Sequence, residues 1–269
     1  MELGISSYSY TWSLGIPGFD YHPSMDVFDL VTKTHQHGLS LLQIADNLPL
    51  HAMDAKDLLK LKYLCGNLNV RLEVGSKGLA SDNLQKYLEI ATYLNSKILR
   101  FVIDDASRKY EPSLSEVKEI ILKAKKELDA RNIILAIENH DRFKANEFAT
   151  LIEDINNPRV GICLDCANSL GAGEGIFETV SILAPYTVNV HFKDISIKRK
   201  SHKMGFDIYG VPFGQGIIPI DWVIGKMPAR CQTGILELWM PPEESWEETF
   251  LKEQKWVESS VKYLRGKLE

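Results

Sequence analysis

The sequence alternates short runs of β-branched and aliphatic residues with longer stretches in which apolar residues recur every three or four positions. This alternation is typical of βαβ units, which assemble into a parallel sheet. Eight rounds fit the chain, with strands expected at residues 3–6, 41–44, 70–74, 98–102, 133–138, 160–165, 188–192 and 234–238. The pattern therefore predicts an α/β fold.

Eight rounds in 269 residues match the size of a (β/α)8 TIM barrel. A doubly wound open sheet uses the same unit, but no glycine fingerprint for a dinucleotide follows the first expected strand. No linker rich in proline, glycine or serine divides the chain. We therefore predict a single (β/α)8 TIM barrel domain over residues 1–269.

Several expected helices carry boundary signals. Ser81 is placed to cap the helix that follows it, and Gly38 and Gly66 stand where C-terminal cap glycines would lie. Residues 113–131 put their apolar side chains on one face, and residues 246–264 predict a last helix. The stretch 196–219, which is rich in lysine and arginine, predicts a long irregular loop that acts as a lid or a flexible arm.

Composition excludes several classes of protein. The 31 Lys and Arg against 36 Asp and Glu give a net charge of −5, so the chain lacks the basic face that nucleic acid selects. No apolar run reaches the length of a membrane span, and the first residues do not resemble a secretory signal. Four cysteines in a chain of this length do not form a disulfide framework, so we expect a cytoplasmic protein.

Four residues that suit metal binding stand at the ends of the last four expected strands. They are Glu138, Asp165, His191 and Glu237. Alternate residues of a strand share a face, so all four can point to the mouth of a barrel if their small or apolar neighbours fill its interior. Three carboxylates and one imidazole suit Mn²⁺, Mg²⁺ or Co²⁺, with Zn²⁺ left open. One acid at a strand end is often a helix cap, but four in successive units predict a divalent metal site.

Cys163 and Cys166 resemble a CxxC motif. Side chains three residues apart on a strand face opposite sides, so we interpret both as ordinary buried cysteines.

Cationic residues near strand ends bear on the substrate. Lys77, Arg100, Lys193 and His140 all lie close to expected strand ends. In one interpretation Lys77 is solvated and Arg100 pairs with a buried acid such as Glu73. In the other, two or more of them face the mouth and favour an anionic sugar, either an acid or a phosphate.

The strand-end segments resemble a known family. The segments are residues 137–140 (IENH), 164–168 (LDCAN), 190–194 (VHFKD), 213–216 (FGQG) and 236–237 (LE). In order and spacing they are similar to the xylose isomerase-like TIM barrels, which include sugar phosphate isomerases, ketose 3-epimerases, hydroxypyruvate isomerase and inosose dehydratase. The resemblance implies a divalent metal held by Glu138, Asp165, His191 and Glu237, with Glu138 and Glu237 also acting as an acid and base pair.

Two positions depart from the ketose epimerases of that family. Asn168 stands where many of them have a histidine, and Ile197 stands where an arginine is common. We therefore take Asn168, together with His140, Lys193 and Arg100, as a candidate substrate-binding residue.

The first functional expectation is a metal-dependent isomerase or epimerase that acts on a sugar, sugar acid or sugar phosphate through an enediolate. The alternative is a lyase, either a dehydratase or a decarboxylase of a keto-sugar acid, which would use the same metal. An apurinic endonuclease needs more histidines and a basic face, and a non-catalytic barrel would have lost its metal ligands. We expect no nucleic acid or membrane partner, and a homo-oligomer is left open.

Overall fold

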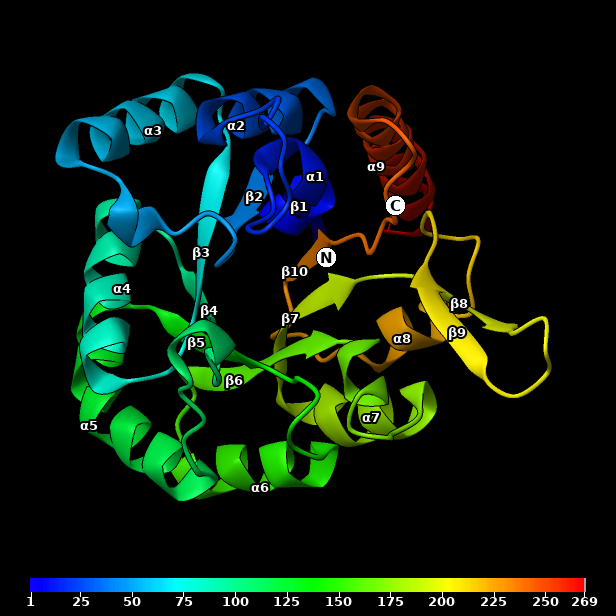
Figure 1. The fold of residues 1–269 in the computed structure, drawn as a ribbon. Helices are drawn as coiled ribbons and strands as arrows, with labels where there is room; N and C mark the ends of the chain where they lie inside the picture. The colour runs from blue at the N-terminus through cyan, green and yellow to red at the C-terminus, as the bar shows by residue number, and fades with distance from the viewer. Residues whose placement is uncertain (269) are drawn as a thin grey trace.

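The computed structural model describes residues 1–268 and contains a closed barrel of eight parallel strands (Figure 1). Around the barrel the strands follow the order β1, β10, β7, β6, β5, β4, β3, β2. Their bounds are β1 Glu2–Ser6, β2 Leu41–Ile44, β3 Arg71–Lys77, β4 Ile98–Val102, β5 Ile134–Glu138, β6 Val160–Asp165, β7 Thr187–Phe192 and β10 Thr233–Leu236. Since the sheet closes, the TIM barrel prediction is confirmed and the open doubly wound sheet is excluded.

Helices form a ring outside the strands (Figure 1). Their bounds are α1 Thr11–Leu14, α2 Val27–Gln36, α3 Ala55–Asn67, α4 Ser81–Tyr93, α5 Leu114–Arg131, α6 Ala145–Ile155, α7 Ile176–Leu183, α8 Ile220–Lys226 and α9 Trp246–Leu268. None of the helices in residues 1–268 combines the length and the hydrophobicity that crossing a bilayer requires.

The helix boundaries agree only partly with the sequence signals. The helix expected over residues 113–131 is α5, and Ser113 caps it in a capping box with Glu116 that the sequence analysis did not identify. Ser81, in contrast, is already the first residue of α4, and Ala80 before it gives no side-chain cap. Gly38 adopts the left-handed φ of 68° after α2, whereas Gly66 lies inside α3 and Asn69 takes the left-handed conformation there.

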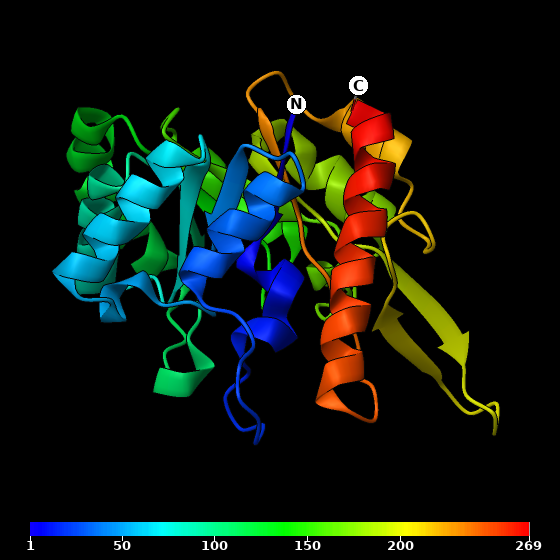
Figure 2. The same cartoon turned by 90° about the horizontal axis from the view of Figure 1, so that it is seen from above.

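The stretch 196–219 is more regular than expected. Its first part is an antiparallel hairpin of β8, Ile195–Arg199, and β9, Phe206–Gly210, which projects away from the barrel (Figure 2). The expectation of an irregular loop is therefore wrong over this part. Apolar and polar residues do alternate in residues 195–198 and 206–208, as in a strand, but the basic residues of this stretch led to the prediction of a loop.

Asp194 anchors the base of the hairpin at the barrel. Its buried carboxylate accepts backbone N–H groups of Ile195, Gly214, Gly216 and Ile218 at 2.9–3.2 Å. A Cβ on Gly216 would lie 2.1 Å from Asp194 Oδ1, so only glycine fits there. These bonds fix the segment that directly follows Lys193.

Candidate active site

The four strand-end residues converge at one end of the barrel. Glu138, Asp165, His191 and Glu237 are all almost fully buried. His191 Nδ1 lies 3.6 Å from Glu138 Oε2, 3.9 Å from Asp165 Oδ2 and 3.5 Å from Glu237 Oε1. Glu237 follows the last residue of β10 rather than ending the strand, but its N–H still bonds to Phe192 O at 2.9 Å. The convergence that strand parity predicted is present, while the role of these residues stays a prediction.

Three atoms of this group form no hydrogen bond. They are Asp165 Oδ2, His191 Nδ1 and Glu237 Oε1, all buried. The other Asp165 oxygen, Oδ1, accepts the N–H groups of Ala167 and Asn168 at 2.7 and 2.9 Å. Buried polar atoms are normally paired, so His191 Nδ1 and Glu237 Oε1, which lie 3.5 Å apart without a hydrogen bond, indicate a site for a cation. The donor set of three carboxylates and an imidazole fits a divalent metal ion.

Lys193 is the cation closest to these carboxylates. Its Nζ lies 2.7 Å from Asp165 Oδ2 and 3.1 Å from Glu237 Oε2, and 4.6 Å from the ring centroid of Trp239. Burial alone would lower the pKa of Lys193, but Asp165 and Glu237 raise it above its ordinary value. Burial alone would raise the pKa of Glu237, but His191 and Lys193 bring it well below its ordinary value. Lys193 is therefore an ammonium and Glu237 a carboxylate.

Arg100 links the two sides of the barrel mouth. Its Nε donates to Glu138 Oε2, and its Nη1 donates to Asp46 Oδ1 at 2.6 Å. The second Glu138 oxygen accepts Asn168 Nδ2 at 2.8 Å. The interpretation that Arg100 pairs with a buried acid is confirmed, but its partners are Glu138 and Asp46, whereas Glu73 points into the barrel toward Gln43 and Asn189. Both oxygens of Glu138 are thus occupied by donors.

A cavity of about 710 Å³ opens above these side chains. Its lining includes the charged residues Asp46, Arg100, Glu138, Lys193 and Glu237, together with Tyr8, Lys77, His140, Arg142 and Trp239. Lys77 lies 3.5 Å from Asp46 and keeps 41% of its side chain exposed, and His140 bonds to Asp141 at the rim with 44% exposed. These two residues border the cavity, whereas Arg100 and Lys193 form part of its buried floor.

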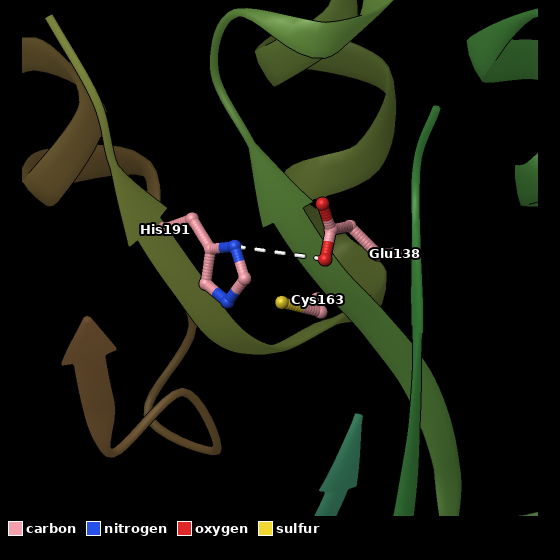
Figure 3. A group of neighbouring side chains, drawn as sticks. All are labelled: Glu138, Cys163 and His191. Atoms are coloured by element: carbon pink, nitrogen blue, oxygen red, sulfur yellow. Dashed lines mark ion pairs between the residues drawn. The ribbon is translucent and has the colours of Figure 1, made fainter. Parts of the chain in front are cut away.

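Cys163 lies beside Glu138 and His191 (Figure 3). Burial raises the pKa of its thiol well above the ordinary value, and its Sγ lies 3.1 Å from Asn189 Oδ1 as a hydrogen-bond donor. Cys166 instead joins the larger apolar core, to which Cys163 does not belong. The two cysteines therefore face different environments, as expected, and Cys163 remains a protonated thiol.

Sequence reasoning missed several residues of the site. Asp46 lies two residues after the expected second strand, so a search for charged residues near strand ends could have found it. Gln43 and Glu73 sit within strands and contact His191 and Asn189 across the barrel, with nothing in the local sequence to indicate it. Ile197, which replaces a common arginine, and Arg199 both lie on the hairpin, and neither lines the cavity within residues 1–268.

Comparisons with known proteins agree with this geometry. The family described as xylose isomerase-like TIM barrel matches residues 29–265. The 3-oxo-isoapionate decarboxylase of Pectobacterium atrosepticum is 29% identical over 268 residues, which are 98% of this chain and 95% of that protein.

Two solved structures show the same fold. A D-psicose 3-epimerase with D-tagatose from Clostridium cellulolyticum H10 has a TM-score of 0.71 at 15% identity, and the match covers 100% of both chains. A barrel protein from Mycobacterium smegmatis in complex with magnesium has a TM-score of 0.63 at 12% identity, covering 87% of this chain and 88% of that one.

Proposed function

Because the chain belongs to the xylose isomerase-like TIM barrel family, we propose that it is a divalent-metal-dependent lyase that decarboxylates a 3-oxo sugar acid. The observation that carries this proposal is the pair of buried cations, Arg100 and Lys193, set against the carboxylate cluster. Both cations offset buried carboxylates of the protein, and both also line the cavity, where they would attract the carboxylate of a sugar acid more strongly than a neutral sugar. The Pectobacterium relative, named as a decarboxylase of a 3-oxo acid, supports the same reaction.

Glu138, Asp165, His191 and Glu237 would hold the metal, and the magnesium complex of the Mycobacterium barrel supports a divalent ion. When bound, such an ion would stabilise the negative charge that develops on the substrate's ketone oxygen. Glu138 is suited to this task as a ligand rather than as a base, because Arg100 and Asn168 already donate to both of its oxygens.

The residues around this cluster account for the remaining steps. In decarboxylation the bond between the substrate's α carbon and its carboxylate breaks, CO₂ leaves, and the electron pair passes to the neighbouring ketone to give an enediolate. The α carbon then needs one proton. Lys193 Nζ is the protonated group beside the cluster, so we assign it the delivery of this proton. Trp239 covers Lys193 and limits access of water to it.

Isomerisation or epimerisation of a sugar is the second candidate. Two glutamates, Glu138 and Glu237, both approach His191, and an acid and base pair of this kind would move a proton between the two faces of a sugar carbon. The similarity in fold to the D-psicose 3-epimerase supports this candidate. It would require Glu138 to release its two hydrogen-bond donors during the reaction.

Mass balance separates the two functions. The Mn²⁺-reconstituted protein is incubated with 3-oxo sugar acids that carry ¹³C in the carboxylate, and with neutral ketoses, and products are followed by ¹³C NMR. The lyase proposal expects labelled CO₂ or bicarbonate, lost in the Lys193→Met variant and retained in Lys198→Met on the exposed hairpin. Conversion of a ketose to an isomer without CO₂ would favour the second candidate, and no turnover of any substrate would contradict both.

A further inference from the structure

A layer of polar side chains crosses the barrel interior below the candidate metal site. It contains Gln43 on β2, Glu73 on β3, Asn189 on β7 and Thr233 on β10, and these side chains are buried. Gln43 Nε2 donates to Glu73 Oε2 at 3.0 Å, and Asn189 Nδ2 donates to the same oxygen at 3.1 Å. Fully buried amides and acids are costly unless they are paired, so this layer needs a reason to exist.

The layer reaches His191 through one contact. Gln43 Oε1 lies 2.8 Å from His191 Nε2. The amide NH₂ of Gln43 donates to Glu73 Oε2 and to Asn189 Oδ1, which leaves the amide oxygen for His191. An oxygen at that position requires a proton on His191 Nε2. The opposite ring nitrogen, Nδ1, is then the one that faces Glu138, Asp165 and Glu237 and would bind the metal.

We propose that Gln43 is a positioning residue that fixes the metal-binding tautomer of His191, and that Glu73 in turn fixes the orientation of the Gln43 amide. This inference rests on the proposed metal site but not on the reaction carried out there. Partners of this kind raise the affinity of a metal ligand by orienting it before the ion binds.

The test compares two double variants that share one substitution. Gln43→Met/Glu73→Gln removes the acceptor for His191 without leaving a buried charge unpaired. Gln43→Glu/Glu73→Gln exchanges the two side chains and keeps an acceptor oxygen in front of His191 Nε2. Mn²⁺ affinity is measured by calorimetric titration, and thermal unfolding checks that both variants fold.

We expect the methionine variant to bind Mn²⁺ about 10- to 100-fold more weakly than the wild type. The exchanged variant should bind at least as tightly as the wild type. Equal affinity in the two double variants would overturn the proposal, whereas absence of Mn²⁺ binding by the wild type would overturn the proposed function instead.

A second readout detects the tautomer of His191 directly in the wild type. In the Mg²⁺-loaded wild type, ¹⁵N-labelled histidine should give a hydrogen-bonded Nε2–H resonance for His191 that exchanges slowly with solvent. The same signal should be lost or fast-exchanging in Gln43→Met/Glu73→Gln. A protonated Nδ1 in the wild type would contradict the assignment even if no variant folds.

The β8–β9 hairpin carries an independent inference. The register pairs Ile197 with Ile208 and Arg199 with Phe206, so these side chains share one face of the ribbon. Ile197, Phe206 and Ile208 are 42%, 54% and 49% exposed. A two-stranded ribbon is only marginally stable by itself, and on this face Arg199 lies 4.3 Å over the ring of Phe206 while the apolar side chains stay about half exposed.

Charge indicates what covers the ribbon. Lys198, Arg199, Lys200 and Lys203 against Asp207 give residues 195–210 a net charge of 4 − 1 = +3, and the rest of the chain then carries −5 − 3 = −8. Beside the hairpin, a groove of about 740 Å³ at the start of α9 contains Leu251, which is 58% exposed, and Trp256. Its rim includes Glu243, Glu244 and Glu248, together with Lys252 and Lys255.

We infer that the hairpin docks on this groove of a second copy of this chain, where Glu244 and Glu248 remain after Glu243 pairs with Lys252. Pro212, two residues after β9, lines the groove, so hairpin and groove adjoin on one side of the molecule. A two-fold axis between them would let each copy insert its hairpin into the other's groove, as symmetric dimers require.

Charge reversal tests this inference. Light scattering after gel filtration should give the wild type twice the mass of one chain. The variants Arg199→Glu/Lys203→Glu and Glu243→Lys/Glu244→Lys should each be monomeric, and an equimolar mixture of the two should recover the dimer mass. A monomeric wild type, or a mixture that stays monomeric, would overturn the inference.

Discussion

The two halves of the barrel mouth differ in the balance of their charges, and each also holds the opposite sign, since the buried cation Lys193 lies beside the carboxylate cluster and Asp46 is the acid beside Arg100. Strands β5 to β7 and the end of β10 bring three buried carboxylates and one imidazole together, whereas the half formed by β1 to β4 supplies a buried guanidinium, Arg100, held by Asp46. Arg100 also binds Glu138 across the boundary. One half is thus built to bind a cation, and the other offsets its negative charge and favours an anionic substrate.

The largest effect is expected from removing a carboxylate in the acidic half. Glu237→Gln should abolish Mn²⁺ binding and lower kcat/KM by about 10²- to 10⁴-fold, because the ligand and its charge are both lost. Titration with Mn²⁺ and steady-state kinetics measure the two effects. Glu119→Gln on the exposed face of α5 is the matched control. Undiminished Mn²⁺ affinity in the Glu237 variant would contradict the proposal that the carboxylate cluster binds the metal ion.

Removing the cation that joins the halves should affect folding first. Arg100→Met leaves Glu138 and Asp46 buried without their partner, which costs about 3–5 kcal/mol in the free energy of unfolding. Arg100→Lys keeps a charge and should lose less. Urea unfolding with and without Mn²⁺ sharpens the comparison, because a bound cation compensates Glu138 and should restore part of the loss. A change below about 1 kcal/mol for Arg100→Met would show that the halves are independent.

A buried acid outside the barrel mouth, Glu253, connects the helix after β1 to the helix after β10. Glu253 on α9 accepts the N–H groups of Trp12 and Ser13 in α1, and burial raises its pKa to about 7 despite these bonds. The folded state therefore holds a proton that the unfolded state loses above its lower pKa. Stability should fall by about 3 kcal/mol as pH rises from about 4.5 to about 7.

Thermal unfolding across this pH range, in the wild type and in Glu253→Gln, checks the effect. The variant should show a flatter dependence, because it has no carboxyl group to titrate at this position. Parallel curves for the two proteins would show that Glu253 does not set the pH dependence.

The smallest effect is expected at the rim of the cationic half. Lys77 is partly exposed and lies 3.5 Å from Asp46, so solvent screens its charge. Lys77→Met should raise KM for a sugar acid by about twofold to fivefold without changing kcat. KM for a neutral ketose should not change. An equal effect on both substrates would argue against recognition of an anion by this half.

The sequence predicted the acidic half far better than the cationic one. Glu138, Asp165, His191 and Glu237 stand at or next to strand ends, where period-two geometry makes their convergence foreseeable. Glu73 was named as an example of an acid that could pair with Arg100, but the partners are Glu138 on the neighbouring β5 and Asp46 after β2, and no local pattern reports these contacts between strands. Gln43 and Glu73 were missed for the same reason, since they meet His191 and Asn189 across the interior.

The most direct test of the account is the position of the metal ion. Crystals of the protein soaked in Mn²⁺ are measured at a wavelength where manganese scatters anomalously. The account predicts one strong anomalous peak within ligand distance of Glu138, Asp165, His191 Nδ1 and Glu237, and no such peak in Glu237→Gln. A peak elsewhere, or none in the wild type, would contradict the claim that the acidic half of the mouth is a metal site.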